Sequence, residues 1–101
     1  MATFTNARAR NTTSSTTYTC SNAAGATIIG LTVANTHSSA VTASVAVNDG
    51  NDNFLIKDAP IGVGSSMVVV GGDQKVVLQN TQSIKVTASN NVDVVVSILE
   101  N

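Results

Sequence analysis

The sequence predicts an all-β domain of about eight strands, folded as an antiparallel two-sheet β-sandwich of jelly-roll or immunoglobulin-like type. Composition is the first reason, because Val, Thr, Ala, Asn and Ser dominate a chain that contains four Leu and one Glu. β-Branched residues suit pleated strands, and the strong helix formers are scarce. Spacing is the second reason, since short strand-like segments alternate with turn residues and no helical period is visible. The Cys and Trp framework of immunoglobulin domains is absent, so both topologies stay open.

The 101 residues are enough for one domain with one core. Residues 1–12 show no two-residue alternation and contain both arginines, Arg8 and Arg10. Such a segment is mobile in isolation unless it is held by the domain or by a partner chain. We therefore expect an extended N-terminal arm over 1–12 that docks through Arg8 and Arg10, followed by the sandwich domain over 13–101.

The first part of this domain is expected to contain a polar edge strand and an antiparallel hairpin. Thr13–Cys20 is rich in Thr and Ser, and a loop follows it. Ala26–Asn35 and Ala40–Asn48 flank a short turn, and their alternation places every second side chain toward the core. In the expected register Val33 pairs with Val41. The core-facing side chains predicted here are Ile29, Leu31, Val33, Val41, Ala43, Val45 and Val47.

The middle of the chain is expected to form shorter strands. Phe54–Lys57 is a strand that Pro60 ends, because proline lacks an amide donor and restricts the residue before it. Met67–Val70 is apolar on both faces, and Lys75–Gln79 follows a glycine-rich turn.

Ser83–Ser89 and Val92–Leu99 are expected to form a final hairpin. A two-residue Asn90–Asn91 turn would bury Asp93, whereas a three-residue loop brings apolar residues together on the core face. The longer loop is therefore predicted. The resulting core pairs are Ile84 with Ile98, Val86 with Val96, and Ala88 with Val94.

This register leaves several apolar side chains pointing outward. Val95 and Leu99 face away from the core together with Val68 or Val70. Contiguous exposed apolar residues mark interaction sites, and a charged content of 11% suits a surface covered by neighbours. We expect a subunit interface at Val68, Val70, Val95 and Leu99; a monomer with a polar surface is the alternative.

Charge and hydropathy exclude several functional classes. Five Lys and Arg residues against six Asp and Glu residues provide no basic patch for nucleic acid or an anionic membrane. No apolar run reaches the roughly 20 residues that span a bilayer, and the first residues do not resemble a secretory signal. We expect a protein made in the cytosol that binds neither nucleic acid nor membranes.

Catalytic and metal-binding candidates are few. Cys20 and His37 have the side chains of a nucleophile and a base. The simpler interpretation is that Cys20 is a half-buried thiol and His37 an exposed histidine in a turn. Residues Asp49–Asn53 offer the oxygen donors that calcium prefers, yet Asp, Asn and Gly also form ordinary turns. We expect no enzyme activity, no cofactor and no metal, with calcium at this turn as the open alternative.

From Ala26 to Glu100 the chain resembles small β-sandwich virion structural proteins of tailed bacteriophages. The motifs that carry the resemblance are, in order, ATIIGLTVANT, AVTASVAVND, FLIKDAPIGVGSS, GGDQKVVL, SIKVTAS and VDVVVSILE. The family pattern often has Gly-Asp before the SIKV strand, where this chain has Thr81-Gln82. The resemblance implies a β-sandwich subunit of the phage particle, without catalytic residues, in the head, neck or tail.

Together these observations predict a non-enzymatic virion structural protein, assembled in the host cytoplasm. We expect a capsid decoration or cement subunit that forms a homo-oligomer and binds neighbouring coat proteins, including the major capsid protein, through its arm and apolar faces. A neck or tail accessory subunit and a receptor- or glycan-binding module are the alternatives, and a small hydrolase at Cys20 or His37 is a third.

Overall fold

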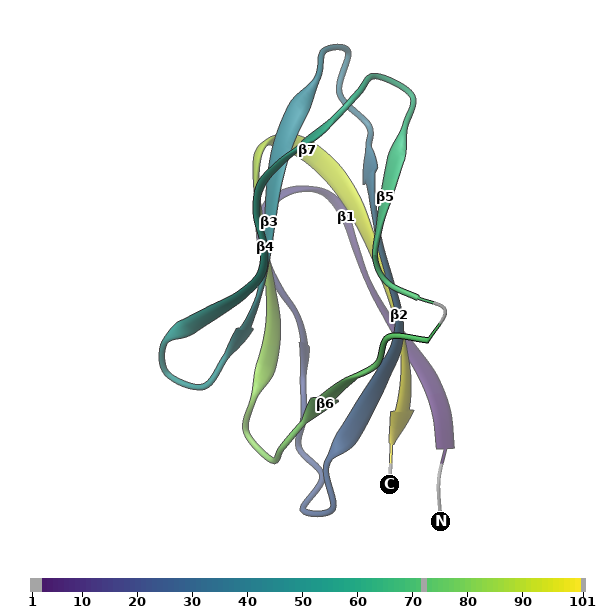
Figure 1. The fold of residues 1–101 in the computed structure, drawn as a ribbon, viewed down its shortest axis with the longest axis vertical. Helices are drawn as coiled ribbons and strands as arrows, with labels where there is room; N and C mark the ends of the chain where they lie inside the picture. The colour runs from purple at the N-terminus through teal and green to yellow at the C-terminus, as the bar shows by residue number, and fades with distance from the viewer. Residues whose placement is uncertain (1–2, 72, 101) are drawn as a thin grey trace.

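The computed structural model describes residues 3–71 and 73–100 and confirms an all-β antiparallel fold. Within these residues there are seven strands, and no helix is long and apolar enough to cross a membrane. Thr3, at the start of the first strand, pairs with Glu100, at the end of the last, so both lie at the same end of the molecule (Figure 1). The strands are β1 (Thr3–Thr19), β2 (Ala26–Asn35), β3 (Val41–Asn48), β4 (Asp52–Ile61), β5 (Ser66–Val70), β6 (Val76–Leu78) and β7 (Ser83–Glu100).

The two longest strands, β1 and β7, form an arch that organises the fold. They pair antiparallel from Thr3 with Glu100 to Thr19 with Ser83, and both bend at mid-length (Figure 1). Residues 83–88 of β7 also pair with β3, which pairs with β4; we call this side the β3 wall. Residues 92–100 of β7 pair with β2, which pairs with β5 and β6; we call this side the β2 wall.

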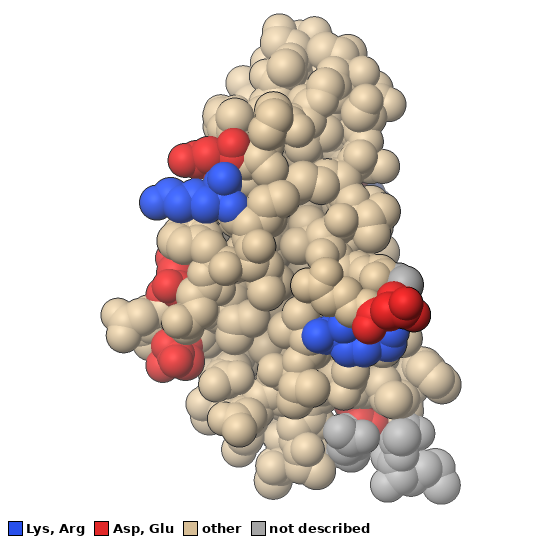
Figure 2. Space-filling model, in the orientation of Figure 1, with Lys and Arg blue, Asp and Glu red and all other residues tan. Residues whose placement is uncertain are grey.

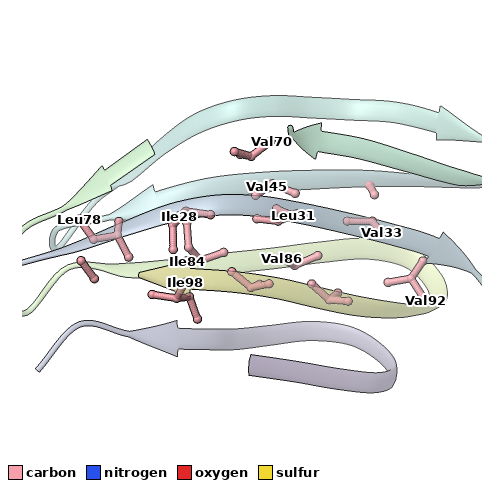
Figure 3. Packing of buried hydrophobic residues seen from close by; sticks show 14 of the residues in the cluster. Ile28, Leu31, Val33, Val45, Val70, Leu78, Ile84, Val86, Val92 and Ile98 are labelled. Carbon is pink, nitrogen blue, oxygen red and sulfur yellow. The ribbon is translucent and has the colours of Figure 1, made fainter. Parts of the chain in front are cut away.

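All seven strands therefore belong to one hydrogen-bonded sheet that curls into a half-barrel. The expected division into two separate sheets is not confirmed, because β1 and β7 run continuously through both walls. The inner faces of the two walls pack against each other, and Figure 3 shows the buried Ile, Leu and Val side chains between them.

The predicted final hairpin is wrong, although its core face is correct. Ser83–Ser89 and Val92–Leu99 are two halves of one bent strand, and each half pairs with β1. The apolar side chains meet across the core from opposite walls instead of lying side by side in one ladder. Periodicity determines which face is buried, but not which strand supplies the backbone partner. The side chains of Ile84, Val86, Val94, Val96 and Ile98 are all fully buried.

Polar contacts hold the bend of the arch. Asn11 has a left-handed backbone with φ 47°, and the β1–β7 register shifts between Ala9 and Thr12. The Thr36 hydroxyl lies 3.1 Å from the carbonyl oxygen of Asn91 and 3.2 Å from Asn11 Oδ1. Asn91, one of the two asparagines that suggested a hairpin turn, therefore lies at a corner of two paired strands, where its backbone carbonyl accepts a hydrogen bond.

The predicted hairpin of Ala26–Asn35 with Ala40–Asn48 is also wrong. β2 pairs with β5, β6 and β7, whereas β3 pairs with β4 and β7, so the two strands lie in different walls. Ile29 is not in the core row, because the register with β7 shifts between Ile28 and Gly30. Such a bulge reverses the face on which the following side chains lie. Ile28, Leu31, Val33, Val41, Ala43 and Val45 are buried, and Val47 packs against the core.

The expected arm does not coincide with a separate element. β1 continues through residue 12, so residues 3–12 are paired with the domain's own β7. No side chain of β1 is fully buried, although Ala7, Ala9 and Tyr18 are partly buried and pack against the core. This strand is therefore held mainly by backbone pairing, which explains why its side chains show no apolar alternation. Met1 and Ala2 lie outside the described residues.

β4 is longer than the predicted Phe54–Lys57. The prediction that Pro60 ends this strand is wrong, since Pro60 lies inside β4, opposite Thr42. Proline is tolerated on an edge strand, where its missing N–H does not interrupt a ladder. Asp58, with φ 51°, lies where the β3–β4 register is irregular, and its N–H donates to Ser44 Oγ at 2.9 Å.

Candidate functional site

The outer surface of the β2 wall brings together exposed apolar side chains from four strands. In antiparallel pairs, residues directly opposite each other project from the same face. The first cross-strand row contains Val68 of β5, Thr32 of β2, Val95 of β7 and Arg8 of β1. The second row contains Val77 of β6, Thr27 of β2, Leu99 of β7 and Phe4 of β1. We call these eight residues the outer rows.

The structure leaves the ends of the outer rows most exposed. Phe4 is 75% exposed, Val77 67%, Val68 66% and Val95 47%, while Leu99 is half-buried. Large apolar side chains at such exposure lack the packing that stabilises them in a core. The outward orientation expected for Val68, Val95 and Leu99 is therefore present, while their role as an interface stays a prediction.

Val70 does not belong to this surface, which corrects its assignment to the interface. It is 1% exposed and lies opposite Leu31 in the core. Strict alternation would place Val68 and Val70 on one face, but the β2–β5 register shifts between Leu31 and Thr32. This bulge turns Val70 inward while Val68 stays outside.

Sequence reasoning missed Phe4 and Val77. Phe4 lies in the segment expected to be an arm, and Val77 lies in an apolar run whose faces could not be distinguished. A large aromatic residue among Thr, Asn and Ala in residues 3–9 was the available signal for Phe4. Only the pairing of β1 and β6 beside Leu99 and Thr27 reveals that both belong to one row.

Charge is sparse beside the outer rows. Arg8, Arg10, Asp93 and Val95 line a shallow depression where β1 meets β7. Arg8 Nη1 donates to Asn6 Oδ1 at 2.6 Å, and Asp93 Oδ1 accepts a hydrogen bond from the Asn11 N–H at 2.8 Å. In the view of Figure 2 the charged side chains form small groups separated by a large uncharged surface.

The outer surface of the β3 wall is polar around one depression, although β4 also exposes Phe54 (47%) and Leu55 (36%) in this wall. This shallow depression is lined by Thr42, Ser44, Asp58, Thr87, Ala88 and Ser89. Ser89 Oγ accepts a hydrogen bond from the Thr42 N–H at 2.9 Å, and Ser44 Oγ lies 3.4 Å from Asp58 Oδ1. The β3 wall therefore differs from the outer rows at this depression, where hydroxyl and carboxylate groups predominate.

Tyr18 and Glu100 connect the two walls at the end opposite the bend. The Tyr18 hydroxyl donates to Glu100 Oε2 at 2.6 Å, although 82 positions separate the residues in the chain. Burial, followed by this hydrogen bond to the carboxylate, raises the pKa of Tyr18 well above its usual range. The pair acts as a polar closure of the half-barrel.

The structure does not bring Cys20 and His37 together. Cys20 is buried before the start of β2, and His37 follows its end. The ten residues of β2 correspond to about 30 Å of extended chain. The two side chains therefore cannot act as a nucleophile and its base.

The Asp49–Asn53 turn uses several of its oxygens in its own hydrogen bonds. Asn48 Nδ2 donates to Asp52 Oδ1 at 2.6 Å, and the Asn51 N–H donates to Asp49 Oδ1 at 3.2 Å. Lys85 Nζ also lies 4.0 Å from Asp52 Oδ1. Among residues 3–71 and 73–100, no three His, Cys, Asp or Glu side chains are grouped to hold a metal ion. The observed contacts are those of an ordinary turn.

A chain from the acidic stable capsid structure of Helicobacter pylori bacteriophage KHP30 has a similar fold. The TM-score is 0.58 and the sequence identity is 11%, with 97% of this chain and 85% of that chain covered. No family model and no curated protein sequence matches this chain. The likeness shows a shared fold, and the two coverages show that the chains are of similar length.

Proposed function

We propose that this chain is a non-enzymatic structural protein of a tailed-bacteriophage virion, and specifically a capsid decoration or cement subunit. The observation that carries the proposal is the fold likeness, over nearly the whole chain, to a chain of similar length in a phage capsid structure. A small chain of this kind suits an accessory subunit that adds to a shell. The sequence motifs from Ala26 to Glu100 support the same class.

The outer rows are the proposed binding surface for neighbouring coat proteins, including the major capsid protein. Covering Val68, Val95 and Leu99 removes apolar area from water, which contributes roughly 25 cal/mol per Å². Arg8 and Arg10 lie beside Val95 and supply hydrogen-bond donors for carboxylates on the neighbour. Apolar contact would then provide affinity, and the arginines would provide orientation.

In this proposal the subunit joins the particle in the host cytoplasm and remains part of the released virion. Electron cryomicroscopy of purified virions tests the position directly. Density for the half-barrel on the shell, repeated with shell symmetry, is the expected result. Density at the neck or tail would replace the decoration role with an accessory role, and absence of the chain from purified particles would reject both.

A binding experiment tests the surface. Particles lacking the chain are mixed with the purified protein and sedimented. Val68→Asp and Val95→Asp introduce charge into the outer rows and are expected to abolish co-sedimentation while the protein stays folded. Thr42→Asp, on the exposed outer surface of the β3 wall, is the matched control and should bind normally. Equal binding by all three variants would exclude the outer rows as the interface.

The hydroxyl-lined depression on the β3 wall favours one second candidate, a receptor- or glycan-binding module. The exposed Asp58 and Thr87 contribute polar atoms that can pair with sugar hydroxyls. A glycan array probed with the purified chain tests this function. Binding that is lost in Asp58→Ala would support it, and an array without signal would reject it.

A further inference from the structure

Among the free strand edges of the described residues, the first half of β1 is the one best suited to accept another strand. β5 has five residues and β6 has three, and β4 contains Asp58 with a left-handed backbone, Pro60 and irregular register. Short strands, proline, charges and bulges are the features that block edge-to-edge pairing. Thr3–Ala9, in contrast, stays in unbroken register with β7 and contains no proline, and its one charged residue is Arg8.

The side chains of this stretch are complementary to themselves. Asn6 is its central residue, and Phe4 and Arg8 lie at equal distances on either side of Asn6. An antiparallel copy centred on Asn6 therefore places Phe4 opposite Arg8 twice, and the guanidinium group over an aromatic ring is a favourable contact. On the inner face, Thr5 lies opposite Ala7, so that only small side chains meet.

We propose that two copies of this chain associate through the free edge of Thr3–Ala9, antiparallel, with Asn6 on the two-fold axis. The pairing joins the β2 walls of both copies into one sheet. The same surface is used by both partners, which closes the symmetry at a dimer.

Other registers are less favourable. Centring the pairing on Arg8 places two guanidinium groups directly opposite each other. Centring it on Ala7 requires Arg10, which lies beyond the last regular pair of Ala9 with Val94. The Asn6-centred register uses the whole regular stretch and keeps the two Arg8 side chains apart.

This pairing gives Phe4 a partner that the single chain does not provide. Phe4 is 75% exposed at the end of the second outer row, and Arg8 ends the first. In the dimer, the second row of one copy continues into the first row of the other. The association depends on the edge of β1 and not on the virion role, so each can fail without the other.

A charge-swap experiment tests the edge and its register. The wild-type chain is expected to dimerise in sedimentation equilibrium. Asn6→Lys and Asn6→Asp each place like charges on the two-fold axis and should weaken self-association by about fivefold. In an equal mixture the Lys–Asp heterodimer should exceed its statistical share in native mass spectrometry.

Disulfide trapping provides a second readout. Cysteine at Asn6 should cross-link two copies by itself, because directly opposite Cβ atoms approach disulfide distance. Arg8→Cys should cross-link with Phe4→Cys and not with itself. Thr42→Cys, an exposed position on the other wall, is the control for random collision.

Three different results of these experiments would overturn the proposed dimer. A wild-type chain that is monomeric at every concentration overturns the proposal. A dimer that Asn6→Asp strengthens and Asn6→Lys weakens also overturns it, because Asn6 would then face Arg8 of the second copy. A dimer in which cysteine at Asn6 traps no more product than cysteine at Thr42 places the interface elsewhere and overturns it as well.

Discussion

Replacing Asn35 by Ala should destabilise the domain by about 3 kcal/mol. Asn35 is 7% exposed, and its Nδ2 lies 2.9 Å from the Ser39 carbonyl oxygen, 3.1 Å from that of Ile61 and 3.2 Å from that of Gly62. Its Oδ1 accepts the His37 N–H at 2.8 Å. Two amide protons and one acceptor correspond to about three net hydrogen bonds of roughly 1 kcal/mol each. The loss is severe for a domain whose total stability is about 5–15 kcal/mol.

Urea unfolding, followed by circular dichroism, measures this effect. The Asn35→Asp variant should be at least as unstable, because a carboxylate has no proton to donate to the three carbonyl oxygens. Asn53→Ala is the matched control, since Asn53 Nδ2 also contacts two carbonyl oxygens but the residue is exposed. Its expected cost is below about 1 kcal/mol. Equal losses for Asn35→Ala and Asn53→Ala would show that this buried amide does not connect β2 to the end of β4.

The folded-state pKa of Tyr18 lies above its unfolded value, so its contribution to stability is complete below about pH 10 and declines as pH rises further. Tyr18→Phe should therefore reduce the pH dependence of the free energy of unfolding in urea over this alkaline range. An unchanged pH dependence would contradict the role of Tyr18 in closing the half-barrel. Val70→Ala should lower the free energy of unfolding by about 2 kcal/mol because it removes buried methyl groups. Val68→Ala, on the exposed side of the same strand, should lower it by less than about 0.5 kcal/mol. Equal shifts of the melting temperature would contradict the bulge that places Val70 inside and Val68 outside. Cys20 is 1% exposed and should react with a thiol reagent at the rate of unfolding, so rapid labelling of the native protein would place it at the surface.

The sequence predicted the strand class and most of the core, because a period of two identifies a buried face without knowledge of the partner strand. Ile84, Val86 and Ile98 illustrate this, since all three are buried as expected while the hairpin that was to contain them does not exist. Asn90 and Asn91 have the residue types of a turn, and nothing local distinguishes a turn from a corner in a paired ribbon. The pairing of both halves of β7 with β1, which is distant in sequence, determines that this segment is a corner and not a turn.

Bulges account for the remaining errors in assigning faces. Ile29 and Val70 each lie where a register shift reverses the alternation, so each was placed on the wrong side. The candidate surface was therefore partly predictable. Val95 and Leu99 were assigned outward from alternation, and Val68 only as an alternative to Val70, whereas Phe4 became part of the surface only through the pairing of β1 with Leu99.

The two proposals concern the same side of the molecule and predict different responses to salt. Covering the outer rows buries mainly apolar area, so salt should weaken capsid attachment only as far as it screens the contacts of Arg8 and Arg10 with carboxylates. Pairing of two β1 edges instead brings Arg8 against Phe4, an electrostatic contact that salt reduces. If both surfaces operate, dimerisation joins two β2 walls and doubles the apolar surface offered to a capsid. Attachment to the particle should then be tighter for the dimer than for an Asn6 charge variant, because two linked binding surfaces raise the effective concentration of the second contact.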